Sequence, residues 1–176
     1  MSQHPDAQSF PVLLKDDAGL MSEIETILSA RALGDPYSDD GSFAANLAIL
    51  PPGLRAMAAT HWLDISLTLD SITWHFGNFG EPHLVAETEA GLHELGLHEL
   101  ALCFQEAKTL MLPLLAERTE ADGDPDELLE RKGLAEAADE INLRAWTLDD
   151  LGSGKSVIYE AWIKYARQHP ERVFIT

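Results

Sequence analysis

The sequence has little cysteine, few basic residues and no long apolar run. One cysteine among 176 residues excludes a disulfide framework within the chain. Cys103 lies in the apolar run from Leu100 to Phe104, where nothing nearby would stabilise a thiolate, so a buried and unreactive thiol is expected. No stretch approaches the roughly 20 consecutive apolar residues that span a bilayer. The start, Met1 to Asp6, lacks the basic and apolar segments of a secretory signal, so a cytoplasmic location is expected.

The scarcity of basic residues leaves a large negative charge. Twelve Lys and Arg stand against 30 Asp and Glu, a net charge of −18, where a small domain commonly carries about 2 to 8 charges of either sign. Residues 1–50 and 51–116 carry eight acids and two bases each, residues 117–150 carry twelve acids and four bases, and residues 151–176 carry two acids and four bases. The folded surface must therefore be negative. Such a surface attracts basic proteins and repels nucleic acid and anionic membranes, so neither of the latter is an expected partner.

Helix signals recur along the chain, whereas no alternation of period two is long enough to build a sheet. We predict an all-α fold, a single-domain bundle of roughly seven or eight helices over residues 19–176, after a loosely ordered segment at residues 1–18. Ser22 and Glu25 form a capping box that predicts a helix start. The expected helices cover about 22–33, 43–49, 53–75, 82–95, 97–111, 126–132, 134–146 and 153–168.

The segment Gly152 to Ser156 resembles part of a phosphate-binding loop. The motif requires a glycine where this chain has Asp149, and the two carboxylates of Asp149 and Asp150 would repel a phosphate. Ser153 or Ser156 as a helix cap explains the segment better. No cofactor is expected from this or any other motif.

The histidines do not show the spacing of a metal motif. His93 and His98 are five residues apart with Gly96 between them, whereas a helical zinc motif places its histidines four apart. A tertiary convergence of histidines with nearby carboxylates stays open, and it would make the chain a metal-dependent helical-bundle enzyme. No pattern indicates an activated nucleophile, so we expect a protein that is not an enzyme.

Three features in sequence order carry a family resemblance. A long helix leads into the aromatic, glycine-containing turn from Trp74 to Gly80, a Leu-x-x-Leu-Gly-Leu junction follows at residues 92–97, and the last helix ends in the run from Tyr165 to Glu171. With these features, residues 50–174 resemble the bacterial helical DNA-mimic protein family, whose members are small and acidic. The aromatic turn itself is expected to pack in the core, with a partner contact as the alternative.

The resemblance implies an all-helical homodimer. In a studied member of that family, a negative surface occupies the DNA-binding face of a transcription regulator. The expected function is therefore a non-enzymatic binding protein whose partner is a basic DNA-binding protein. Eighteen net charges correspond to the phosphates of about nine base pairs. The alternative is a generic interaction or scaffold domain whose acidity serves solubility.

The candidate partner-binding residues are carboxylates expected on exposed helix surfaces. For each of them the alternative is a solvated surface acid or, near a helix start, a capping residue. The candidates are Asp122, Asp124, Asp126, Glu127 and Glu130 around one loop and helix start, Asp139 and Glu140 further on, and Glu87, Glu89, Glu94 and Glu99 along the central helix pair.

Overall fold

The computed structural model describes residues 10–118, 124–150 and 153–174 of the chain. Within these ranges the chain forms helices, turns and no strand, which confirms the predicted all-α single-domain bundle. None of the described helices combines the length and the apolar character that crossing a membrane requires. The elements are η1 (Pro11–Leu14), α1 (Asp17–Arg31), α2 (Ser42–Leu47), α3 (Pro52–Leu69), α4 (Ile72–Phe79), α5 (Pro82–Glu94), α6 (His98–Ala116), α7 (Pro125–Lys132), α8 (Ala135–Asp149), α9 (Val157–Gln168) and η4 (Pro170–Arg172).

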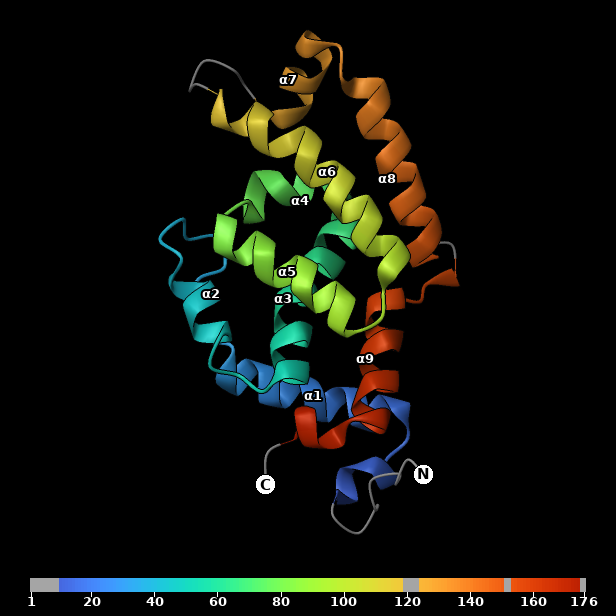
Figure 1. Ribbon diagram of the computed structural model, residues 1–176. Helices are drawn as coiled ribbons and strands as arrows, with labels where there is room; N and C mark the ends of the chain where they lie inside the picture. Colours follow the sequence, from blue (N-terminus) through green and yellow to red (C-terminus); the bar gives the residue numbers. More distant parts are fainter. Residues whose placement is uncertain (1–9, 119–123, 151–152, 175–176) are drawn as a thin grey trace.

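Two helices organise the bundle. Helix α3 packs against α4, α5 and α9, and helix α6 packs against α4, α5 and α8. Helix α7 lies at one end of the molecule, α8 runs from that end along one side toward α9, and α1 lies at the opposite end (Figure 1). The acidic helix α7 is therefore presented at one end of the bundle.

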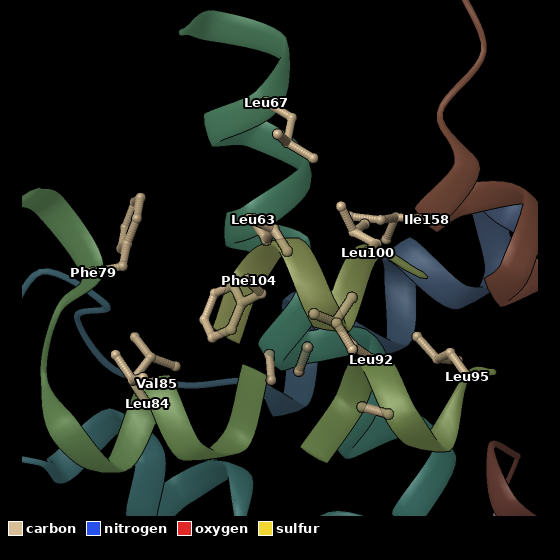
Figure 2. Packing of buried hydrophobic residues seen from close by; sticks show 14 of the residues in the cluster. Leu63, Leu67, Phe79, Leu84, Val85, Leu92, Leu95, Leu100, Phe104 and Ile158 are labelled. Atoms are coloured by element: carbon tan, nitrogen blue, oxygen red, sulfur yellow. The ribbon is translucent and has the colours of Figure 1, made fainter. Parts of the chain in front are cut away.

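The core forms where α3, α5 and α6 meet. Leu63 of α3, Leu92 of α5 and Phe104 of α6 are fully buried and gather in the same region (Figure 2). Burying one such side chain stabilises the fold by roughly 1.5–3 kcal/mol. Cys103, on the same helix as Phe104, is buried as predicted, and burial raises the pKa of its thiol.

The predicted helix over residues 53–75 is wrong at its end, because the structure divides it into α3 and α4. Asp70 leaves helical geometry with φ −154° and ψ −99°, and Ser71 caps α4 by accepting a hydrogen bond from the Trp74 amide at 3.1 Å. The new helix direction lets the Thr73 amide donate to Asn142 of α8 at 3.2 Å. This extra break accounts for nine α-helices among the described residues where seven or eight were predicted.

The predicted capping box at Ser22 and Glu25 is also wrong. Helix α1 begins earlier, at Asp17, because Asp16 accepts a hydrogen bond from the Gly19 amide at 2.8 Å. Ser22 lies inside that helix. Residues 10–18 contain η1 and the start of α1, and residues 1–9 lie outside the described part of the chain.

Gly53 allows the start of α3 to approach the end of α9. A Cβ atom at this position would lie 2.5 Å from Tyr165 Cε1 and 2.8 Å from the carbonyl oxygen of Arg172. Since a backbone carbonyl cannot rotate away, we expect Gly53→Ala to lower the free energy of unfolding by about 1–3 kcal/mol, measured by urea denaturation. The control is Gly77→Ala, whose Cβ would have its nearest contact at 3.1 Å, with a proline side chain. Equal stability of the two variants would contradict the prediction.

Candidate acidic binding surface

Helix α7 forms from strong local signals. Asp124 caps it by accepting a hydrogen bond from the Glu127 amide at 2.9 Å, and Pro125 occupies the first helical position. Gly133, with φ +69°, ends the helix in the left-handed conformation that glycine adopts without strain. Leu128 and Leu129 are buried, so they anchor α7 to the bundle while its charged residues face solvent.

The fold gathers carboxylates around Asp126. Partial burial raises the pKa of Asp126, and the neighbouring carboxylates of Asp70, Asp124, Asp139 and Glu130 raise it further. No basic side chain contributes to this shift among the described residues. We call these five residues the α7–α8 acidic surface. The clustering of like charges around Asp126 makes its ionised form less favourable than that of an isolated carboxylate.

Asp70 is a member of this surface that the sequence analysis missed. It lies just after α3, and its carbonyl oxygen accepts a hydrogen bond from Trp146 Nε1 of α8 at 2.8 Å. This bond fixes the end of α3 beside α8. No local sequence signal connects Asp70 with α7, since only tertiary packing brings the two together.

Two further candidates extend the acidic character of α7 and α8. Glu127 and Glu140 are both exposed, and Glu140 lies close enough to Arg144 to raise the pKa of that guanidinium. Glu136 is also exposed and precedes Asp139 and Glu140 by three and four positions, a spacing that puts the three on one side of α8. This spacing was visible in the sequence, although Glu136 was not among the candidates.

Three of the candidate carboxylates form ion pairs with basic side chains of the bundle. Glu87 of α5 accepts two hydrogen bonds from the Arg55 guanidinium of α3, which raises the pKa of Arg55. Glu89 forms an ion pair with Lys108 of α6.

Glu94 lies 2.9 Å from Arg172 and also accepts a hydrogen bond from the Tyr165 hydroxyl. Glu87, Glu89 and Glu94 therefore hold helices together. Glu99 is exposed in the first turn of α6, and Asp122 lies outside the described residues.

Most basic residues of the described chain are already paired. Eight lysine and arginine side chains each lie within ion-pair distance of a carboxylate. Since the chain has 30 acids and 12 bases, these pairs leave a large excess of anionic groups. The surface charge that remains is therefore strongly negative.

The histidines that could have converged on a metal ion lie in separate contacts instead. His75 lies 2.9 Å from Ser66 Oγ, His61 lies 3.2 Å from the Tyr159 hydroxyl, and the rings of His93 and His98 are 5.9 Å apart. Among the described residues there is no group of three or more His, Cys, Asp or Glu side chains that could hold a metal ion.

Ser156 caps α9 by accepting a hydrogen bond from the Tyr159 amide at 3.1 Å. This confirms the cap that the sequence analysis preferred to a phosphate-binding loop.

Comparison with known proteins adds one finding. The family model described as DMP19-like protein matches residues 48–169, a range that includes α3 to α9 and the whole α7–α8 acidic surface. No curated protein and no solved structure matches the chain.

Proposed function

Because the chain belongs to the DMP19-like protein family, which is a family of DNA mimics, we propose that it is a non-enzymatic DNA mimic. Its partner is a basic DNA-binding protein, such as a transcription regulator, whose DNA-binding face it occupies. The observation that supports this function most directly is the α7–α8 acidic surface, where four neighbouring carboxylates raise the pKa of Asp126.

The helical scaffold gives these charges fixed positions. Asp126 and Glu130 are four residues apart on α7, which is about 6 Å along a helix axis. In one DNA strand, phosphates follow one another every ~3.4 Å along the duplex axis. Four residues of helix thus correspond to about two phosphate steps, so a groove lined by arginines and lysines can meet carboxylates of α7 at roughly the spacing of every second phosphate. A flexible acidic tail would have to be ordered first, at an entropic cost.

A partner captured from host lysate at low salt provides the test. We expect duplex DNA to displace this partner, because both ligands would occupy the same basic face. We also expect the triple variant Asp126→Asn, Glu130→Gln, Asp139→Asn to bind at least tenfold more weakly, with a shallower dependence of log Kd on log salt concentration. Isothermal titration at several salt concentrations measures both quantities.

The matched control removes three charges from elsewhere on the surface. Glu25→Gln, Asp39→Asn and Glu171→Gln change exposed acids that form no ion pair with a described residue. We expect this control to bind within about threefold of the unaltered chain, since long-range attraction is weakened by salt. Equal losses in both triple variants, or a partner that DNA does not displace, would favour a generic acidic scaffold.

The homodimer implied by the family resemblance and the cytoplasmic location are part of the same proposal. A dimer would present two copies of the α7–α8 acidic surface. This arrangement suits the two-fold symmetry of many dimeric DNA-binding regulators.

A further inference from the structure

A second acidic feature lies inside the molecule, away from the α7–α8 acidic surface. A cavity of about 670 Å³ lies between the second half of α3 and the junction of α8 with α9. This volume is within the range of roughly 300–1,000 Å³ that small-molecule sites occupy. Its lining residues are Asp64, Ile65, Thr68, Leu69, Asp149, Gly154, Lys155, Ser156 and Tyr159.

Two buried carboxylates line this cavity. The exposed fraction is 5% for Asp64 and 0% for Asp149. Burial raises the pKa of both groups, and the Asp64 and Asp150 carboxylates add to the shift of Asp149. A buried anion beside a second anion is unfavourable unless a positive group compensates it.

The two oxygens of Asp149 differ in their partners. Oδ1 accepts a hydrogen bond from the Val157 amide at 3.0 Å and so helps to cap α9. Oδ2 is buried and has no hydrogen-bond partner among the described residues. An asparagine would satisfy the Val157 amide equally well without a buried charge. Capping therefore explains one oxygen of Asp149 and leaves the other, buried oxygen without a hydrogen-bond partner among the described residues.

Asp64 is held in place by hydroxyl groups. It accepts a hydrogen bond from Ser156, and the nearby Tyr159 hydroxyl also lowers its pKa, against the larger effect of burial. Tyr159 in turn contacts His61 Nδ1 at 3.2 Å. This network fixes the Asp64 carboxylate of α3 against the α8–α9 junction, close enough to Asp149 to raise the pKa of that group.

Lys155 is not the counter-ion of these acids. Its side chain is 72% exposed, and its ammonium lies 3.9 Å from Glu160. Leu69 is 70% exposed, so Leu69 and Lys155 mark the mouth of the cavity, with Ile65 further along its apolar side. The cavity thus combines an apolar wall with acidic groups deeper inside.

We infer that this cavity binds an aliphatic organic cation, an ammonium or guanidinium group carried on an apolar chain. The cationic head pairs with the carboxylates of Asp149 and Asp64, and Ile65 and Leu69 contact the chain. Such a head can come from a free amine or guanidine, or from a lysine or arginine side chain of another protein. The inference does not depend on the DNA-mimic function, because it rests on different residues.

The test is an NMR titration of the full-length chain labelled with nitrogen-15. The free probes are butylammonium and butylguanidinium, and the peptide probes are capped Gly-Lys-Gly and Gly-Arg-Gly. We expect saturable amide shifts at the end of α3 and the start of α9 with at least one probe. Tighter binding of the free probes identifies a small molecule as the source, and tighter binding of the peptides identifies a protein side chain.

Two variants and one neutral probe make the test specific. We expect Asp149→Asn to weaken binding at least tenfold, whereas Asp39→Asn, an exposed change of equal charge, leaves it within about twofold. Lys155→Gln should strengthen binding, because it removes a like charge from the mouth. Absence of saturable shifts, unchanged binding by Asp149→Asn, or equal binding of butanol would each overturn the inference.

Discussion

Replacing His75 with leucine is expected to reduce the sensitivity of this fold to acid. His75 is fully buried, and its Nδ1 lies 2.9 Å from Ser66 Oγ. Its Nε2 has no hydrogen-bond partner among the described residues. Burial lowers the pKa of His75 to about 3 from the ordinary value of 6.5, because a charged imidazolium would lose its hydration there.

The direction of the effect follows from proton binding in the two states. Between pH 6.5 and 3 the unfolded chain protonates His75 and the folded chain does not, so the free energy of unfolding falls as the pH decreases. The loss is about 1.4 kcal/mol per pH unit and at most about 5 kcal/mol in total. Since leucine does not titrate, His75→Leu should gain stability relative to the unaltered chain by this amount as the pH falls.

Urea denaturation at intervals between pH 7 and pH 3.5 measures this difference. The control is His93→Gln, which removes an exposed histidine at the end of α5. If His75→Leu and the unaltered chain gave parallel profiles, His75 would not be the group that couples protonation to unfolding.

The helices could be predicted from the sequence wherever the signals are local. Ser156 was recognised as a cap because its hydroxyl acts only three residues away. The break between α3 and α4 was missed although Ser71 is a good cap, because the apolar stripe of α3 continues through the break to Ile72. Ser22 was wrongly predicted to start a helix, because its capping-box pattern occurs inside α1. That helix begins earlier, at Asp17, and Asp16 is its cap.

The residues of the candidate site likewise fall into two groups, those that the sequence places together and those that only the fold brings together. The acids of α7 are neighbours in the sequence, so Asp124, Asp126 and Glu130 could be grouped before the fold was known. Asp70 joins them only through packing of the α3 end against α8. The pairing of Glu87 with Arg55 likewise depends on the contact of α5 with α3, which periodicity does not specify.

The properties of Asp149 depend on its tertiary environment. In the sequence it is only the residue that breaks a phosphate-binding motif. In the fold it is a fully buried carboxylate whose pKa rises to about 6 from the ordinary value of 3.8. Burial is the main cause, so the folded state carries a charge that is less stable there than in the unfolded chain.

Asp149→Asn is therefore expected to raise the free energy of unfolding by as much as about 3 kcal/mol above pH 6. Between pH 6 and 3.8 the folded chain keeps a proton on Asp149 that the unfolded chain releases, so the penalty shrinks as the pH falls and disappears below 3.8. The asparagine oxygen keeps the bond to the Val157 amide, so the cap of α9 is preserved. The matched control is Asp39→Asn, which makes the same chemical change at an exposed position.

Asp149 and His75 act in opposite directions between pH 3.8 and 6, so their effects partly cancel in the unaltered chain. Removing Asp149 should consequently expose the acid sensitivity caused by His75, and urea denaturation of Asp149→Asn should show a steeper loss of stability in this pH range.

A variant that is more stable at pH 7 and also binds the cationic probes more weakly would show that the buried charge serves ligand binding at the expense of stability. An Asp149→Asn protein no more stable than the unaltered chain at pH 7 would mean that the buried carboxylate is already compensated.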